Sequence, residues 1–215
     1  MTSLTERLAT CYSGVVYDIM RDMGLPPAVL PHSIKSLENH VKIAGPVFTL
    51  RGRPDPSVGA HESLLEWTSF LSKAAVGHVV VCQPQDSNRA LMGELSAEAL
   101  KLRGVLGYLV DGGARDVSFI KKIGFPVFCR YTSPIDVVGN WRPEAMEEPV
   151  TIGNVVIHPG DYILGDEDGV VVIPKAHAEE VISRSEVAMN TESLVRKAIL
   201  EGQDPQEAYV KYGKF

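Results

Sequence analysis

The sequence predicts an α/β fold, and three features of the chain carry that prediction. Up to Trp141, short apolar runs typical of buried strands alternate with amphipathic stretches typical of helices. A segment of short β runs separated by turn residues follows, and a long helical stretch comes after it. With 215 residues, 45% of them hydrophobic and 22% charged, the chain fits a single globular domain over 1–215.

Two N-terminal helices are predicted within about residues 3–23. Ser3 and Glu6 match a capping box, in which each side chain accepts a hydrogen bond from the backbone N–H of the other residue. Apolar residues then recur at helical spacing as far as Met23, with a break expected around Ser13–Gly14. The segment "GLPPAVLP" should end the second helix and form a loop.

The central sheet is predicted from four apolar runs. The first, "VKIAGPVFTLRG", predicts a strand region with a glycine–proline turn inside it. The runs "GHVVVCQ", "GYLVD" and "FPVFCRY" predict further strands, and the continuous apolar character of "GHVVVCQ" is typical of a strand covered on both faces. Helices are expected between these strands at residues 61–75, 88–103 and 116–122, which together predict a mixed sheet with helices.

The C-terminal part of the chain predicts hairpins followed by helix. In "PVTIGNVVIHPGDYILGDEDGVVVIP", short β runs are separated by Gly, Pro, Asn and Asp. The acidic "GDEDG" within it could suggest a cation-binding loop, but a hairpin turn is the favoured interpretation. A long helix is predicted over about residues 175–201, with one short helix in the tail.

Composition excludes several classes of function. The net charge of -6 provides no basic surface for nucleic acid. No apolar stretch approaches the roughly 20 residues needed to span a bilayer, so no membrane partner is expected. The start "MTSLTERLAT" does not resemble a signal peptide, and Cys11, Cys82 and Cys129 lack metal-binding or disulfide-framework spacing. These features predict a cytoplasmic protein with reduced, buried thiols.

The segment "LVDGGARD" places an adjacent Arg–Asp pair directly after a predicted strand. Ligands of open α/β sheets bind at the carboxyl ends of the strands. Arg115 offers a planar fork suited to a carboxylate, and Asp116 offers hard oxygen atoms suited to magnesium or manganese. An alternative stays open, in which Asp116 caps the following helix and Arg115 is solvated.

A second segment, "MGELSAEAL", has a glycine that leads into a helix. The free N–H groups of a helix N-terminus bind anions, so a small carboxylate could lie between this turn and Arg115. Taken alone, Gly93–Ser96 could also be an ordinary loop between a strand and a helix. The two segments together favour a binding site.

In their order along the chain, several segments resemble the RraA-like family. This family includes the 4-hydroxy-4-methyl-2-oxoglutarate/4-carboxy-4-hydroxy-2-oxoadipate aldolases and the protein regulators of ribonuclease E activity. The segments are "YDIMRDMG", "IAGPVFTLRG", "GHVVVCQ", "GELSA", "GVLGYLVDGGARD", "FPVFCR" and "PGDYILGDEDGVVVIP". The resemblance covers most of the chain, and its most specific feature is the interval from Gly93 to Arg115, followed at once by Asp116. It implies a swivelling β/β/α sandwich.

The resemblance implies how a substrate would bind. The loop of Gly93, Glu94, Leu95 and Ser96 would hold the pyruvyl group of a small 2-oxo acid, partly through backbone amides. Arg115 would bind and polarise the keto oxygen or the carboxylate. Glu94 would hold a catalytic water, at a position where the aldolases usually carry Asp.

The resemblance also implies a metal and an assembly. Asp116 would ligate Mg²⁺ or Mn²⁺ directly. The family forms homotrimers, sometimes stacked into hexamers, with active sites at subunit contacts. Glu192, in the predicted C-terminal helix, best matches a glutamate with which a neighbouring subunit reaches the water shell of the metal; a surface pair with Arg196 is its alternative.

The chain also departs from the aldolase pattern. Phe119 stands where the aldolases carry an acidic residue. This predicts a drier wall of the site and either a less polar substrate or better decarboxylation than aldol cleavage; the alternative is that Phe119 is core packing for the short helix. Three functions remain open: a metal-dependent aldolase or decarboxylase that releases pyruvate, a non-catalytic regulator of a ribonuclease or other protein, and a different lyase or hydro-lyase acting on an oxo- or hydroxy-acid.

Overall fold

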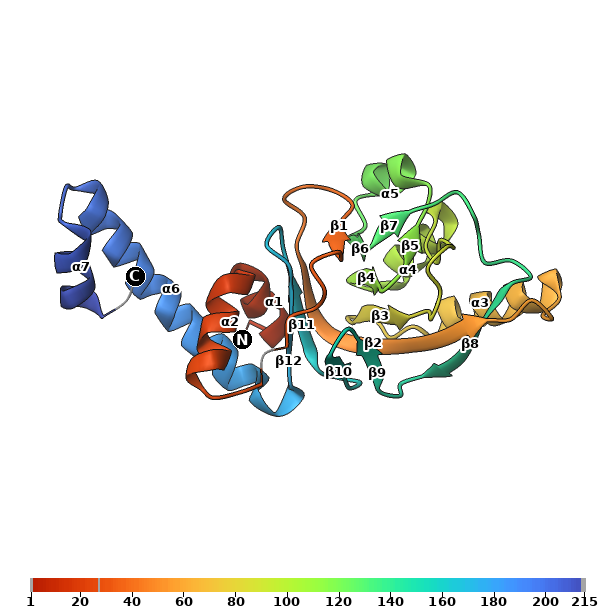
Figure 1. Cartoon of the computed structure of the whole chain (residues 1–215), viewed down its shortest axis with the longest axis horizontal. Coiled ribbons are helices and arrows are strands. Elements are labelled where there is room, and N and C mark those ends of the chain that lie inside the picture. Colours follow the sequence, from red (N-terminus) through yellow and green to blue (C-terminus); the bar gives the residue numbers. More distant parts are fainter. Residues whose placement is uncertain (1, 27, 214–215) are drawn as a thin grey trace.

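A curled, eight-stranded mixed sheet organises the molecule (Figure 1), which confirms the predicted α/β class. This computed structural model describes residues 2–26 and 28–213; residues 1, 27, 214 and 215, which the predicted domain 1–215 includes, lie outside the described residues. The path through the sheet is β1–β6–β4–β3–β2–β11–β12, and β8 pairs with β2. The bounds are β1 (Lys35–Ser36), β2 (Ile43–Pro54), β3 (Val79–Gln83), β4 (Gly107–Val110), β6 (Val127–Cys129), β8 (Trp141–Met146), β11 (Tyr162–Gly165) and β12 (Val170–Ile173).

The sheet has a parallel half and an antiparallel half that share β2. In the parallel half, β2, β3, β4 and β6 are neighbours, and every residue of β3 except Gln83 is fully buried. In the antiparallel half, residues 43–46 of β2 pair with β11, which pairs in turn with β12. The parallel half therefore contains the strand ends at which ligands of α/β proteins bind.

The glycine–proline turn predicted inside β2 is wrong. Gly45 has a φ of 151°, a value that residues with a side chain rarely adopt, and the strand continues through Pro46. After Pro46 the partner of β2 changes from β11 to β3. Gly45 thus allows β2 to bend where the two halves of the sheet meet, so no turn is needed.

Helices cover the two halves separately (Figure 1). Beside the parallel half lie α3 (Ala60–Lys73), α4 (Glu94–Arg103) and α5 (Val117–Ile123). Next to β11 and β12 lie α1 (Leu4–Thr10), α2 (Ser13–Asp22) and the start of α6 (Ala178–Leu200), whose buried residues share one apolar cluster. A short 3₁₀ turn (Lys175–His177) precedes α6, and α7 (Pro205–Tyr212) follows it, as predicted for this part of the chain.

The N-terminal helices confirm the predicted capping box. The Ser3 hydroxyl accepts a hydrogen bond from the Glu6 N–H at 3.2 Å, and the Glu6 carboxylate accepts one from the Ser3 N–H at 2.8 Å. The break between the two helices falls at residues 11–12, just before the expected position. The carboxylate of Asp166 accepts hydrogen bonds from the N–H and the hydroxyl of Ser13, both at 2.7 Å, and so joins the start of α2 to the β11–β12 turn.

The remaining strands form two small sheets. They are β9 (Val150–Ile152) with β10 (Val155–Ile157), and β5 (Gly113–Ala114) with β7 (Tyr131–Thr132). The segment "GDEDG" is the turn of the β11–β12 hairpin, which confirms the interpretation as a turn. All three cysteines are free and buried.

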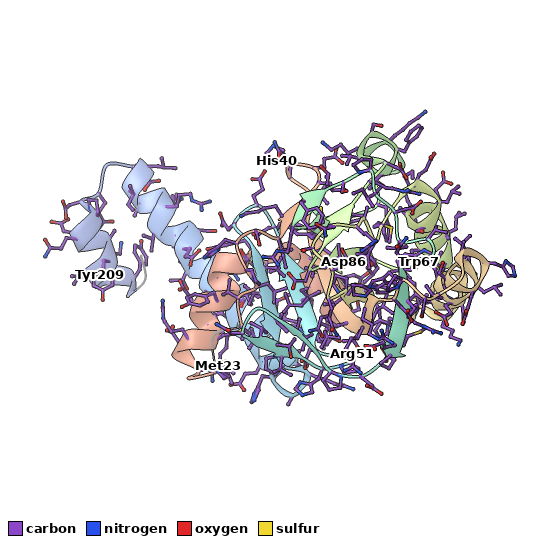
Figure 2. All side chains as sticks on the ribbon, turned by 45° about the vertical axis from the view of Figure 1, so that its right-hand side comes forward. Met23, His40, Arg51, Trp67, Asp86 and Tyr209 are labelled. Carbon is purple, nitrogen blue, oxygen red and sulfur yellow. The ribbon has the colours of Figure 1, made fainter. Side chains whose placement is uncertain are left out.

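The C-terminal helices form an arm that extends away from the sheet (Figure 1). In Figure 2, Tyr209 on this arm lies at the opposite end of the molecule from Trp67, which is beside the parallel half of the sheet. Leu200 and Val210 of the arm are 81% and 76% exposed. Among the described residues, no helix combines the length and the apolar character needed to cross a membrane.

Candidate functional site

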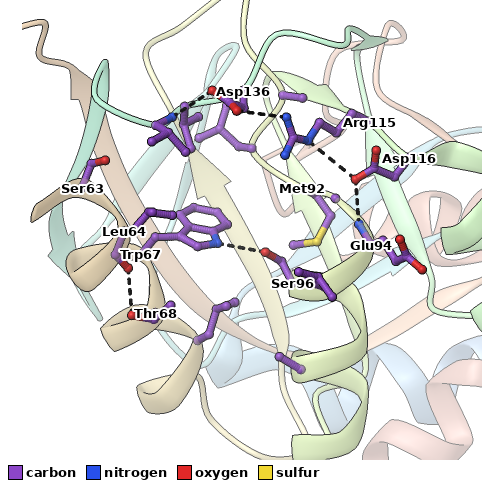
Figure 3. Close-up of a pocket in the computed structure, with 18 residues that line it drawn as sticks. Ser63, Leu64, Trp67, Thr68, Met92, Glu94, Ser96, Arg115, Asp116 and Asp136 are labelled. Carbon is purple, nitrogen blue, oxygen red and sulfur yellow. Dashed lines mark hydrogen bonds and ion pairs between the residues drawn. The ribbon is translucent and has the colours of Figure 1, made fainter. Parts of the chain in front are cut away.

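The two predicted motifs meet at the carboxyl ends of β3 and β4. After β3 the chain runs through a loop into α4, and after β4 it runs through β5 into α5. The two connections are hydrogen-bonded to each other, because the Leu91 N–H donates to the Gly113 carbonyl and the Arg115 N–H donates to the Met92 carbonyl. A pocket of about 530 Å³ opens here, and Gly93–Ser96, Arg115 and Asp116 all line it (Figure 3).

The helix predicted over 88–103 begins at Glu94, six residues later than expected. Residues 88–93 form a loop that is held by the buried Asp86. The Asp86 carboxylate accepts hydrogen bonds from the N–H groups of Asn88 and Arg89 at 2.7 and 2.8 Å, and it pairs with the Arg89 guanidinium at 2.7 Å. Because the chain is not helical here, the first turn of α4 faces the pocket.

Asp116 joins the two motifs. Its Oδ2 accepts a hydrogen bond from the Glu94 N–H at 3.1 Å, and a Cβ built at Gly93 would lie only 2.6 Å from the same oxygen. Asp116 stands at the N-cap position of α5 in a left-handed conformation, but its side chain makes no capping hydrogen bond. The alternative in which this carboxylate only caps the next helix is therefore wrong, because the side chain is directed across to α4.

Arg115 lies between two carboxylates (Figure 3). Its Nε is 3.6 Å from Oδ2 of Asp116, and its terminal Nη1 is 3.2 Å from Oδ2 of Asp136. Asp136 is itself oriented by the Val138 N–H, which donates to its Oδ1 at 3.2 Å. Arg115 is thus positioned rather than simply solvated. Sequence reasoning missed Asp136, because "SPIDVVGN" contains no recognisable motif and lies 20 residues further along the chain.

The N-terminus of α4 leaves donors directed at the pocket. Among the residues that the structure describes, none accepts a hydrogen bond from the N–H of Leu95 or Ser96, and the N-cap residue Gly93 has no side chain to do so. The Ser96 hydroxyl accepts a hydrogen bond from the indole N–H of Trp67 at 2.9 Å, which leaves the hydroxyl proton available for a ligand. Such a terminus favours an anion, as predicted.

The rest of the pocket wall is largely apolar, although the hydroxyl side chains of Ser63 and Thr68 also line it. Trp67 packs against Phe70 and Trp141, with ring centroids 5.1 and 5.9 Å away, and it also lines the pocket. The other apolar side chains of this wall come from α3, the loop before α4 and the loop after β7: Leu64, Leu71, Met92, Val137 and Val138. Helix α3 was predicted as an amphipathic helix, but nothing in its sequence indicated that it faces a site.

Phe119 does not form part of this wall. It lies on α5 and is 50% exposed, and it is absent from the residues that line the pocket. The prediction that Phe119 makes the site drier is therefore wrong in this structure. The alternative that it packs in a core is also wrong, because half of its surface is exposed.

Glu192 lies far from the pocket in its own chain. It is on α6, whereas Asp116 precedes α5 at the other end of the molecule (Figure 1). The Glu192 carboxylate accepts a hydrogen bond from the Tyr12 hydroxyl. Burial, together with this hydrogen bond, raises the pKa of Tyr12 to about 12. The predicted role of Glu192 in the site of a neighbouring subunit stays a prediction.

The residues of the pocket suit a divalent ion that keeps most of its water ligands better than an ion that is surrounded by protein ligands. Within the described residues, no group of three or more His, Cys, Asp or Glu side chains could surround a metal. Asp116 Oδ2 is held by the Glu94 N–H, and Oδ1 accepts no hydrogen bond from a described residue. Mg²⁺ is commonly bound through one or two carboxylates and keeps several waters, so a single oriented carboxylate suits it.

Comparison with known proteins identifies the family. The family described as "RraA-like: Aldolase/RraA" matches residues 13–172. The chain belongs to the RraA-like family. A solved RraA-like structure, Streptomyces coelicolor RraAS2, superposes on this RraA-like protein with a TM-score of 0.78 at 26% identity, over 90% of this chain and 95% of that one. It is described as an unusual member of the RNase ES inhibitor RraA protein family, and the match confirms the predicted fold.

This RraA-like protein covers most of the length of one relative and about a third of the length of another. It is 30% identical over 187 residues to a candidate 4-hydroxy-4-methyl-2-oxoglutarate aldolase of Halalkalibacterium halodurans, over 85% of this chain and 83% of that protein. It is 29% identical over 215 residues to protein DlpA of Legionella pneumophila, over 99% of this chain and 34% of that protein. The chain therefore spans about a third of the length of DlpA. The family thus includes both candidate aldolases and RNase inhibitors.

Proposed function

We propose that this RraA-like protein is a divalent-metal-dependent lyase. It cleaves a pyruvyl-containing hydroxy-oxo acid to release pyruvate, and it decarboxylates oxaloacetate as a second reaction. The observation that carries the proposal is that the free N–H groups of α4, the Arg115 guanidinium and the Asp116 carboxylate face one pocket. The similarity to the H. halodurans protein supports it.

Different residues of the pocket bind different parts of a 2-oxo acid. The carboxylate of the acid accepts hydrogen bonds from the N–H groups of Leu95 and Ser96, where the helix dipole favours negative charge. Arg115 donates to the keto oxygen, and Asp136 keeps the guanidinium in the orientation that this contact needs. Asp116 holds Mg²⁺ or Mn²⁺, which when bound acts as a Lewis acid on the substrate.

The cleavage follows from these positions. Through a water that it holds, the Glu94 carboxylate accepts the proton of the C4 hydroxyl, and the bond between C3 and C4 breaks to leave a carbonyl compound. The electron pair of that bond forms the enolate of pyruvate, whose negative oxygen is stabilised by Arg115. Protonation at C3 gives pyruvate. Oxaloacetate reaches the same enolate by losing carbon dioxide.

A second candidate function is a non-catalytic regulator of a ribonuclease. The similarity to Streptomyces coelicolor RraAS2 favours it. A third, a different lyase or hydro-lyase on an oxo- or hydroxy-acid, would use the same anion-binding turn and Arg115. Both predict no release of pyruvate from the compounds named below.

The assembly that we propose is a homotrimer or a hexamer. The arm formed by α6 and α7 carries exposed apolar side chains, and Leu95 at the mouth of the pocket is 78% exposed. A ring in which each arm contacts the next subunit would cover such surfaces and would bring Glu192 to the site of a neighbour.

The test is the release of pyruvate from 4-hydroxy-4-methyl-2-oxoglutarate and from oxaloacetate by purified protein, with Mg²⁺, with a chelator, and with Mg²⁺ added back. We expect activity that the chelator abolishes and Mg²⁺ restores, and we expect Asp116→Ala to behave like the chelated protein. Full activity in metal-free protein would contradict the metal, and no pyruvate under any condition would contradict the lyase.

A further inference from the structure

We infer that the pocket selects 2-oxo acids with one carboxylate and an apolar, preferably aromatic, group at the far end. This inference rests on the proposed function and specifies the substrate of the same site. The ligands to be compared all have the same 2-oxo acid head and differ only in the chemistry of the tail. Three observations carry it: the separation of polar and apolar walls, the engaged polar atoms of the apolar wall, and the charges of the lining residues.

The charged groups of the pocket gather at one end. In Figure 3, Arg115, Asp116 and Asp136 lie together, whereas Trp67 and Leu64 of α3 lie across the pocket from them. The α4 donors and Arg115 can bind only the head of a 2-oxo acid. In a pocket of about 530 Å³, which is within the usual range for small-molecule sites, the rest of the ligand must then lie along α3.

The α3 side of the pocket offers few free hydrogen-bond donors to the tail of a ligand. The hydroxyls of Ser63 and Thr68, which line it, donate to backbone carbonyls of α3 at 2.9 and 2.8 Å. Leu64, Leu71 and Val137 have no polar side-chain atom. The indole N–H of Trp67, the one polar atom of its ring, already donates to the Ser96 hydroxyl. Trp67 therefore presents carbon to the pocket, and an aromatic tail would pack against it.

The charges of the lining residues disfavour a second carboxylate. Among the described residues that line the pocket, Arg115 is the only Lys or Arg, while Glu94, Asp116 and Asp136 are acidic. Arg115 already lies within 3.6 Å of two of those carboxylates. A carboxylate at the far end of a ligand would be desolvated against α3 without a cation or an N–H donor, which is costly.

Binding of uncleavable ligands tests the inference apart from catalysis. We would compare 2-oxo-4-phenylbutanoate with 2-oxoglutarate by titration calorimetry on the full chain with Mg²⁺. Both have the same head, and neither has the C4 hydroxyl that cleavage requires. We expect the phenyl compound to bind about tenfold more tightly or better, because its ring is buried and the second carboxylate is not satisfied.

A matched pair of variants locates the effect. Leu64 lines the pocket and is 45% exposed, whereas Leu65, its neighbour on α3, is 56% exposed and faces away from this pocket. Since both side chains are exposed, an arginine at either position should leave the fold intact. We expect Leu64→Arg to shift the ratio of the two affinities toward 2-oxoglutarate by about tenfold, and Leu65→Arg to leave it unchanged.

The outcomes separate this inference from the proposed function. Equal or tighter binding of 2-oxoglutarate by the native chain would overturn the inference even if pyruvate were released. So would an unchanged ratio in folded Leu64→Arg. Tighter binding of the phenyl compound without pyruvate release from any 4-hydroxy-2-oxo acid would support the selectivity but contradict the lyase. Failure of both ligands to bind would overturn both proposals.

Discussion

At the scale of single residues, the carboxylate of Asp116 can lie against Gly93 because glycine has no side chain. A Cβ at Gly93 would lie 2.6 Å from Asp116 Oδ2. We expect Gly93→Ala to move this carboxylate and to lower kcat/KM about 10²-fold, since misplacement by about 1 Å has that effect. Pyruvate release measures the loss.

Gly59→Ala is the matched control for this substitution. Gly59 is also the N-cap of a helix, α3, so any change in N-cap preference is shared, but a Cβ there would meet nothing within 4 Å. We expect Gly59→Ala to keep full activity. Equal activity in both variants, with both folded by circular dichroism, would mean that Asp116 need not be held against α4.

Arg115 has a role that depends on the shape of its guanidinium. It must contact a ligand while it stays between Asp116 and Asp136, and the single ammonium of lysine cannot do both. We expect Arg115→Lys to lower kcat by about 10²–10³, the usual effect of losing one charge contact in the transition state.

The control for Arg115→Lys is Arg130→Lys. The Arg130 side chain is 44% exposed and pairs with Asp111 at 3.2 Å, so it resembles Arg115 in exposure and charge, but it does not line the pocket. Its substitution should leave kcat unchanged. If the two variants lose activity equally, the loss reflects the fold rather than ligand binding.

At the scale of elements, the sequence predicts the placement of site residues that are close together in the chain, but not of those that tertiary packing brings together. Arg115 and Asp116 are adjacent and follow a strand, so their place at its carboxyl end is evident from the chain alone. Trp67 and Asp136 are separated from them by long stretches and reach the pocket only through the packing of α3 and the loop after β7. The start of α4 was misplaced because an acidic side chain, Asp86, captures backbone N–H groups that a helix would otherwise use.

The Asp86 loop predicts a dependence of stability on pH. Burial alone would raise the pKa of Asp86, but hydrogen bonds from the Asn88 and Arg89 N–H groups and the Arg89 guanidinium lower it below the usual value. The stabilisation is therefore present above the unfolded pKa of about 4 and is lost as the pH falls through the lower folded pKa. Asp86→Asn should reduce the free energy of unfolding at pH 7 by about 2 kcal/mol.

Urea denaturation at several pH values measures this difference. The gap between native and Asp86→Asn protein should narrow below about pH 4, because Asp86 becomes protonated first in the unfolded chain and only at lower pH in the folded one. Asp22→Asn is the control, because Asp22 is 57% exposed and its pair with Arg21 lies on the surface. A gap that stays constant with pH would show that the carboxylate charge does not hold the loop.

At the scale of the whole molecule, the arm lies at the opposite end from α3 and α4, the helices that line the pocket (Figure 1). The arm is joined to the body where α6 packs against α2, and Tyr12, the residue before α2, donates a hydrogen bond to Glu192 of α6. A residue of the arm can therefore act at the pocket only in another copy. This separation makes the proposed role of Glu192 testable by mixing subunits.

We expect Asp116→Ala and Glu192→Ala to be inactive alone and to regain activity when they are unfolded and refolded together. In a mixed ring, a site is intact where a subunit with native Asp116 meets a neighbour with native Glu192. Random mixing in equal amounts should restore about a quarter of the sites. Pyruvate release measures the recovery, and light scattering must give the mass of a trimer or hexamer. No recovery in refolded rings, or a monomeric mass, would mean that Glu192 serves only its own chain, as the partner of Tyr12.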